Sequence, residues 1–243
     1  EDGRVFVAGG GAGESLMALD VKTGAPIWKT GDEKITHASP IVTTIHGVRQ
    51  VVWFLQSGLV SVDPKTGAEL WRHSFPYKVS TAASPIVSGD LVYCSAGYGV
   101  GAGAAKVTKN GSQWTATEAY RFAGNKPLAN HWSTPVLKDG HLFGMFQFKE
   151  YGNGPVKCVD IATGTVKWEQ PGFGPGHVIL TASGVLALSD DGHLVLIDPN
   201  TSAYKELARA DVLDGKCWTT PVLANGKIFA RSTKEAVCLD LGR

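Results

Sequence analysis

The segment Leu59-Val60-Ser61-Val62-Asp63-Pro64-Lys65-Thr66-Gly67, with Trp71 four residues further on, recurs along this chain of 243 residues. In each full copy the Gly lies four residues after the Asp and the Trp eight residues after it. The other full copies are Met17–Gly24 with Trp28 and Lys157–Gly164 with Trp168. Weaker copies are centred on Val107, which replaces the Asp, on Asp198 and on Asp240. The six copies are 38 to 53 residues apart, a period typical of repeated supersecondary units.

Each copy predicts a β-hairpin. Apolar and polar residues alternate up to the Asp, as in a half-buried strand. The Asp side chain can accept hydrogen bonds from the backbone of a tight turn, and the Gly suits the turn position that needs a positive φ. The Trp then falls on the returning strand, where its ring can pack against a neighbouring unit.

Two further patterns complete each unit. Ser or Thr followed by Pro and then Ile or Val opens a strand, and because Pro lacks a ladder donor we expect this strand to be the innermost one. It occurs in Ala38–Val42, Ala83–Val87, Ser133–Leu137 and Thr219–Leu223. A third apolar run lies between the two phrases, in Gln50–Phe54, Leu91–Cys94, His141–Met145, Val185–Leu188 and Lys227–Ala230. Each unit is therefore expected to be a four-stranded antiparallel meander.

Such meanders, repeated without a competing helical period, predict an all-β fold, a β-propeller of four-stranded antiparallel blades. The first strand, Arg4–Ala8, has the pattern of a second strand of a blade, and Leu239–Leu241 that of a third. We therefore expect about six blades with incomplete terminal blades, in one propeller domain over residues 1–243.

Charge and hydropathy argue against nucleic-acid binding and against a membrane-spanning segment. The 23 basic and 22 acidic residues are interspersed and leave a formal net charge of +1, so no electrostatic footprint for nucleic acid is present. No apolar run approaches the roughly 18 residues of a membrane span. We expect no nucleic-acid partner and no transmembrane segment.

The four cysteines occupy strand-like positions without Cys-x-x-Cys spacing, which argues against a zinc site. They are Cys94, Cys158, Cys217 and Cys238. We expect buried free thiols, and the strand between Cys217 and Cys238 should hold these two too far apart for a disulfide.

The starts of the innermost strands should converge on the mouth of the propeller channel. Alignment on the Pro places there the candidate ligand-binding residues His37, His131, Trp132, Cys217 and Trp218. A sixth candidate, His177, falls near the matching place in the fifth copy. Three interpretations stay open: a shallow pocket for a ligand or peptide, a metal held by the three histidines, and rings that close the channel mouth and hydrogen-bond the inner-strand ends. We predict no metal site and no catalytic residue.

The Asp-x-x-Thr-Gly-x-x-x-Trp phrase, together with the Ser/Thr-Pro strand opener, closely resembles the pyrroloquinoline-quinone-type (PQQ-like) propeller repeat over nearly the whole chain. The resemblance implies that Trp28, Trp71 and Trp168 form contacts between adjacent blades, and Trp114 is a further candidate. The fifth copy departs from the pattern, since it has Thr201-Ser202 and Tyr204 where Thr-Gly and Trp are expected.

Members of this family usually have seven or eight blades, so we expect the chain to be a piece of a larger propeller. The resemblance implies two functions. The first is a non-catalytic scaffold of the bacterial envelope or periplasm, similar to the outer-membrane assembly lipoprotein of Gram-negative bacteria, which works without a cofactor and presents its top-face loops to a protein partner or small ligand. The alternative is a quinoprotein alcohol or polyvinyl-alcohol dehydrogenase with PQQ and calcium, although the sequence has no Cys-Cys pair.

Overall fold

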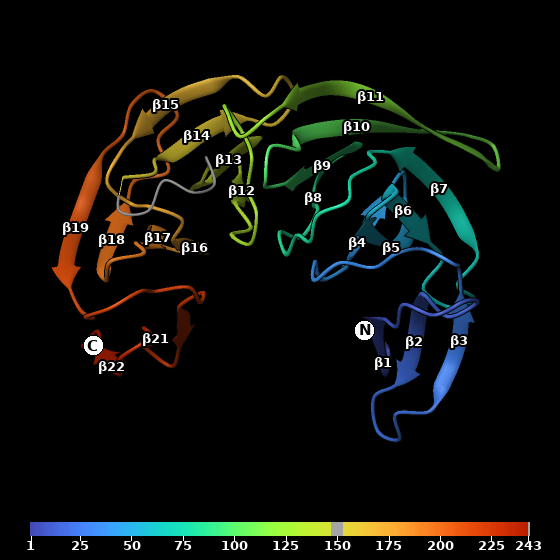
Figure 1. The fold of residues 1–243 in the computed structure, drawn as a ribbon, viewed down its shortest axis with the longest axis horizontal. Coiled ribbons are helices and arrows are strands. Elements are labelled where there is room, and N and C mark those ends of the chain that lie inside the picture. Colours follow the sequence, from blue (N-terminus) through green and yellow to red (C-terminus); the bar gives the residue numbers. More distant parts are fainter. Residues whose placement is uncertain (147–152, 243) are drawn as a thin grey trace. The chain divides into compact units, whose positions relative to one another are not determined.

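The computed structural model describes residues 1–146 and 153–242. These residues form antiparallel sheets in which strands follow one another in sequence order (Figure 1). Four sheets have four strands, and the first and last have three. The all-β fold with incomplete terminal blades is therefore confirmed.

Residues Glu1–Ala123 form one compact unit with three sheets. Each predicted Ser-Pro opener leads into the innermost strand of its sheet. The strands are β1 (Arg4–Ala8), β2 (Leu16–Asp20) and β3 (Pro26–Thr30); β4 (Ile41–Ile45), β5 (Val48–Leu55), β6 (Gly58–Val62) and β7 (Glu69–Ser74); and β8 (Ile86–Ser88), β9 (Leu91–Ala96), β10 (Gly101–Asn110) and β11 (Gln113–Ala123).

The second unit, Gly124–Arg243, contains the other three sheets. Its strands are β12 (Val136–Lys138), β13 (His141–Met145), β14 (Val156–Asp160) and β15 (Val166–Gln170); β16 (His177–Thr181), β17 (Gly184–Leu188), β18 (His193–Ile197) and β19 (Glu206–Asp211); and β20 (Val222–Ala224), β21 (Lys227–Arg231) and β22 (Ala236–Asp240). Within the described ranges, no helix has the length and apolar character that a membrane span requires.

The repeated Asp closes the turn between the third and outer strands. The Asp20 carboxylate accepts hydrogen bonds from the backbone N–H groups of Lys22 at 3.0 Å and Thr23 at 2.8 Å. Asp63 and Asp160 do the same in their turns. The Gly of the phrase has a positive φ, 74° at Gly67, where a Cβ is costly. The sequence phrase therefore acts as a turn signal, as expected.

The third sheet departs from this pattern. Lys106, which pairs with Leu91, stands where Asp20 stands opposite Arg4. The reading of Val107 as the Asp replacement is thus shifted by one residue. Without the carboxylate no tight turn forms, so β10 and β11 continue to a turn at Gly111, which has φ 59°.

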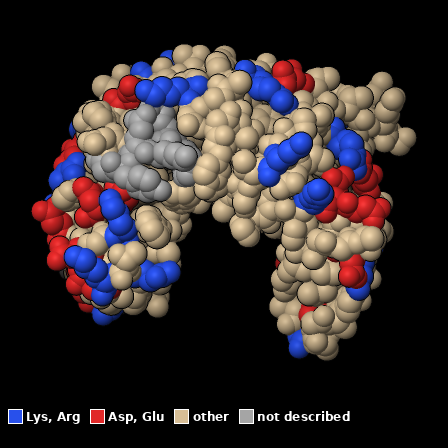
Figure 2. All heavy atoms as spheres, in the orientation of Figure 1, with Lys and Arg blue, Asp and Glu red and all other residues tan. Residues whose placement is uncertain are grey.

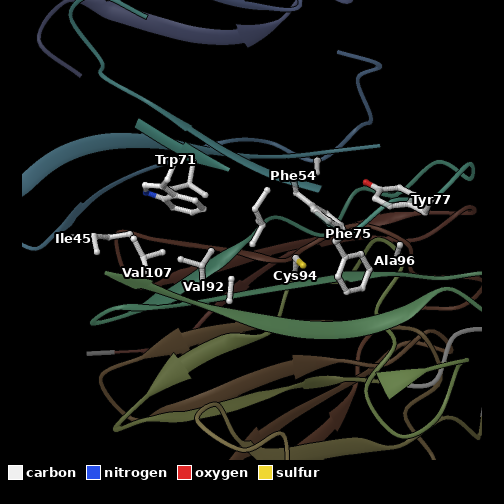
Figure 3. Packing of buried hydrophobic residues seen from close by; sticks show 13 residues of the cluster. Ile45, Phe54, Trp71, Phe75, Tyr77, Val92, Cys94, Ala96 and Val107 are labelled. Carbon is white, nitrogen blue, oxygen red and sulfur yellow. The ribbon is translucent and has the colours of Figure 1, made fainter. Parts of the chain in front are cut away.

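The core lies between successive sheets of a unit. In the first unit, Phe54 and Trp71 of the second sheet pack with Val92 and Val107 of the third (Figure 3). In the second unit, Phe143 and Cys158 of the fourth sheet pack with the fifth sheet. The second and fifth sheets contact a sheet on either side within their own units, so every residue of β6 and of β17 is buried. Acidic and basic residues are interspersed on the face seen in Figure 2.

Candidate functional site

The outer strands share one register position, which is set by a bulge in their pairing with the third strand. In each sheet that has an outer strand, the pairing of the third strand with the outer strand contains a bulge. The bulge lies directly after one residue of the third strand. The outer-strand residues paired with that position are Trp28, Trp71, Tyr120, Trp168 and Ala208. The repeat phrase identified the three tryptophans, whereas Tyr120 and Ala208 are visible only from the register.

Two of these indoles bond to the next sheet within their unit. Trp28 Nε1 donates to the Pro64 carbonyl at 3.0 Å, and Trp168 Nε1 donates to the Asn200 carbonyl at 2.8 Å. Trp71 differs, because its Nε1 donates to Gln50 Oε1 of its own sheet at 2.6 Å. All three rings are buried, so each combines apolar contact with a satisfied N–H donor.

Trp114 and Tyr204 lie elsewhere. Trp114 pairs with Lys109 near the tip of the long hairpin, and its ring centroid is 6.2 Å from that of His46 in the preceding sheet. Tyr204 packs on Trp168, with ring centroids 5.7 Å apart. In the fifth sheet, the register position that holds Trp28, Trp71 and Trp168 in other sheets is therefore occupied by the methyl group of Ala208.

The candidate residues at the inner-strand starts link successive loops. In the first unit, the His37 backbone N–H donates to the Thr81 carbonyl at 2.9 Å, and His37 Nδ1 lies 2.8 Å from Ser80 Oγ. These contacts tie the loop before β4 to the loop before β8. His37 is exposed.

In the second unit, Trp132 reaches the next loop in the same way. Its Nε1 donates to the Pro175 carbonyl at 3.1 Å. The rings of His131 and Trp132 meet edge to face with centroids 5.0 Å apart. Both residues line a small hollow beside Pro175 and Phe146, with room for about one water molecule.

His177 continues this row to the loop before β20. Its buried imidazole lies 3.0 Å from the Trp218 carbonyl through Nε2 and 3.1 Å from Thr220 Oγ1 through Nδ1. A carbonyl only accepts, so Nε2 carries the proton. Burial lowers the pKa of His177 to about 4, against the hydrogen bond to Trp218, which raises it.

Cys217 and Trp218 are adjacent in sequence but differ in exposure to solvent. Cys217 is fully buried, its N–H donates to the Asp190 carbonyl at 2.9 Å, and burial raises the pKa of its thiol. The side chain of Trp218 is 53% exposed. The described loops of the second unit thus form a row, His131–Trp132, His177 and Cys217–Trp218, in which Trp218 is the most exposed ring.

The cysteines are all reduced. Cys94, Cys158 and Cys217 are buried, and Cys238 is exposed. Burial raises the pKa of Cys158 to about 12 and holds that of Cys94 well above its usual range. The three buried thiols are core residues.

The buried acidic and His side chains of these loops are engaged within the protein. Calcium takes roughly six to eight oxygen ligands, and among residues 1–146 and 153–242 no three His, Cys, Asp or Glu side chains lie close enough to hold a metal. The buried Asp190 carboxylate is 3.2 Å from Lys216 Nζ. Both nitrogens of His177 are engaged in hydrogen bonds.

Comparison with known proteins supports the propeller fold. BamB from Moraxella catarrhalis is similar with a TM-score of 0.65 and 16% identity, over 97% of this chain and 69% of that chain. The quinohemoprotein alcohol dehydrogenase from Comamonas testosteroni is similar with a TM-score of 0.59 and 16% identity, over 88% of this chain and 42% of that chain. At these identities the likeness concerns the fold alone. The chain spans less than half of the dehydrogenase.

No curated protein matches the sequence. The family model described as "Outer membrane protein assembly factor BamB" matches residues 1–145, more than half of the 243 residues. The chain therefore belongs to this PQQ-repeat family.

Proposed function

We propose that this protein is a non-catalytic scaffold of the bacterial envelope that binds a partner protein through the loops preceding its inner strands. The observation that carries the proposal is Trp218. Its ring is 53% exposed, while its backbone carbonyl accepts a hydrogen bond from the buried His177. A large aromatic side chain on a fixed backbone is the kind of residue that anchors protein interfaces, and its preorganisation reduces the cost of binding.

Comparable contacts join loops within each unit. Trp132 and Pro175 join two further loops of the second unit by one hydrogen bond. In the first unit, His37 joins two loops in the same manner. Loops held on a rigid strand scaffold commonly carry binding functions. Membership of a family described as an outer membrane protein assembly factor supports an envelope protein as the partner.

Site-specific photo-crosslinking in the source bacterium tests the proposal. A photoreactive phenylalanine analogue at Trp218 should give a discrete adduct with an envelope protein. The same analogue at Leu207 on β19, which is 45% exposed, is the matched control and should give none. Adducts of equal yield at both positions, or none at Trp218, would overturn the assigned surface.

The competing function is a quinoprotein dehydrogenase, which has the same fold. Purified protein mixed with pyrroloquinoline quinone and calcium should show no quinone absorbance after gel filtration and no dye-linked oxidation of alcohols. Stoichiometric retention of the quinone together with dye reduction would replace the scaffold with the enzyme.

A further inference from the structure

Three loops of the first unit are joined by backbone hydrogen bonds at one end of its sheets. In an antiparallel meander, the loop before the first strand and the turn between the second and third strands lie at the same end. The N–H of Gln56, in the β5–β6 turn, donates to the carbonyl of Lys34, in the loop before β4, at 3.0 Å. The N–H of Tyr77, in the loop before β8, donates to the Gln56 carbonyl at 3.0 Å. Lys34 and Tyr77 are therefore held on either side of Gln56.

The β9–β10 turn belongs to the same network. The Thr81 carbonyl accepts the N–H of His37, and Thr81 Oγ1 donates to the Ser95 carbonyl at 3.3 Å, just before that turn. Four loop segments are thus connected through contacts inside one unit. Their exposed residues considered below are called the basic loop surface: Lys34, His37, Lys78, Ser80 and Tyr98.

The carboxylates of these loops and of the β1–β2 loop are engaged within the unit. Glu14 forms an ion pair with Lys29. Glu33 forms one with Arg72 at 3.0 Å. Asp32 accepts a backbone N–H from the β1–β2 loop at 2.6 Å. The acidic side chains at this end are therefore already occupied.

The two lysines of the basic loop surface differ from these acidic residues. Lys34 and Lys78 are exposed, and no ion pair joins either of them to a carboxylate among residues 1–146 and 153–242. Their ammonium groups are therefore available to an anionic partner, to which they would be attracted through solvent over about a Debye length. The local charge of this end is positive although the whole chain is close to neutral.

Tyr98 adds an aromatic ring in an uncommon backbone conformation. Tyr98 and Gly99 have φ of 56° and 83°, and the Val100 N–H donates to the Gly97 carbonyl at 3.2 Å. This is a type I′ turn, which favours Asn, Asp or Gly at its first central position. A residue with a Cβ pays about 1–2 kcal/mol there, yet the Tyr98 ring is 50% exposed. Backbone strain of this kind is concentrated at functional positions.

The backbone under the basic loop surface is held by close packing. A Cβ at Gly101, directly after the Tyr98 turn, would lie 2.0 Å from the Phe122 carbonyl oxygen, so β10 approaches β11 closely there. Tyr77, which precedes Lys78, packs its ring on Phe54 with centroids 5.0 Å apart (Figure 3). A surface that is preorganised in this way loses little conformational entropy on binding.

We propose that the basic loop surface binds an acidic, extended segment of the partner protein. This inference rests on the proposed function and names the chemistry of the partner. Carboxylates of the segment pair with Lys34 and Lys78, and an apolar or aromatic side chain packs on the ring of Tyr98. His37 and Ser80 bond to each other and so join the two loops that carry the lysines. Complementary charge provides specificity and fast association, and the exposed ring provides an anchor.

A display library of random short peptides tests the chemistry of the partner. Selection on the immobilised wild-type chain should enrich peptides that combine several Asp or Glu residues with an apolar or aromatic residue. The Lys34→Glu, Lys78→Glu variant should lose this preference and enrich peptides with Lys or Arg. The matched control is Lys22→Glu, Lys65→Glu, which changes the net charge equally at exposed turns on the other end of the sheets. It should enrich the same acidic peptides as the wild type.

The peptide enriched most strongly on the wild-type chain then serves as the probe in fluorescence anisotropy. Lys34→Glu, Lys78→Glu should weaken its binding at least about tenfold, and added salt should weaken binding to the wild type. Tyr98→Asn should also weaken binding at least about tenfold, because Asn tolerates the positive φ but removes the ring. Its urea midpoint should equal or exceed that of the wild type, which separates loss of the ring from loss of the turn.

Several outcomes would overturn the inference: enrichment of neutral or basic peptides on the wild type, no enrichment, or equal peptide affinity of the wild type and the Lys34→Glu, Lys78→Glu variant. Phosphatidylglycerol vesicles are a second probe. Vesicle binding that this variant abolishes would assign the surface to an anionic membrane instead. The crosslinking experiment at Trp218 separates this inference from the proposed function. A discrete adduct at Trp218 without acidic selection would reject the acidic segment alone, whereas acidic selection without that adduct would reject the surface assigned to the second unit.

Discussion

At the residue scale, three buried ring N–H groups of this chain find partners across neighbouring loops or sheets. The indoles of Trp28 and Trp168 donate to carbonyls of the next sheet, and His177 donates to the next loop. Such donors add direction to otherwise non-directional apolar packing. The same residue types therefore stabilise the fold at buried positions and remain available for binding where they are exposed, as at Trp218.

His177 should make stability depend on pH. Its pKa is about 4 in the folded protein, below the 6.5 of a free imidazole. Between these values the unfolded chain binds a proton that the folded chain excludes, so unfolding becomes easier as pH falls from about 6.5 to 4. The full effect is roughly 3 kcal/mol. Above pH 6.5 the contribution is constant.

Urea unfolding at pH 7.0 and 5.0 measures this effect. The His177→Gln variant, which keeps an N–H donor for the Trp218 carbonyl, should lose most of the difference between the two pH values. If the variant keeps the wild-type difference in unfolding free energy between the two pH values, groups other than His177 cause the pH dependence.

Trp168 should contribute more to stability than Trp218. Trp168→Phe removes the donor to the Asn200 carbonyl and part of a buried ring, which should lower the free energy of unfolding by about 1–3 kcal/mol. Trp218→Phe alters an exposed ring and should change it by less than about 0.5 kcal/mol. Urea midpoints at pH 7 compare the two variants, and equal midpoints would contradict the docking role of Trp168.

At the element scale, the hairpin turn and the inter-sheet contact are coupled through a glycine. Gly24 and Gly67 occupy the same turn position, with φ of 71° and 74°. A Cβ at Gly24 would meet open space, whereas a Cβ at Gly67 would lie 2.6 Å from Trp28 Cε3. The turn of the second sheet is thus a surface on which the indole of the first sheet rests.

This geometry predicts unequal costs for the same substitution. Gly24→Ala should destabilise by about 1 kcal/mol, the cost of a left-handed conformation for a residue with a Cβ. Gly67→Ala should cost roughly 1–3 kcal/mol more, because Trp28 must move. Thermal or urea unfolding of the two variants measures the difference. Equal losses would mean that the indole does not rest on the turn in solution.

At the scale of the whole molecule, the sequence predicted the sheets better than it predicted their exact strand pairing. The Asp, Gly and Pro positions were informative because turns and strand starts impose local backbone requirements, so all-β meanders and incomplete terminal sheets could be predicted. The strand register of the third sheet could not be predicted, because Lys106 replaces the Asp and the turn lies at Gly111 instead. The sequence already showed that the fifth copy lacks the expected Trp, but only the strand pairing shows that Ala208 takes its position.

The loop residues illustrate the same limit. Comparison of the repeats placed His131, His177 and Trp218 at or near successive inner-strand starts, and hydrogen bonds link their loops in the second unit. That Trp218 is exposed and His177 buried depends on packing around each ring, which repeat spacing does not encode.

Stability should also be uneven across the second unit. Every residue of β17 is buried, whereas exposed residues alternate along β21 and β22. Amide exchange follows local opening, which is easier where few apolar contacts must be broken. By hydrogen-exchange mass spectrometry, the amides of β21 and β22 should therefore exchange earlier than those of β17. Equal protection would mean that the sixth sheet is covered in solution. A concentration series separates the causes, since coverage by a second copy would disappear on dilution, whereas intrinsic stability would not.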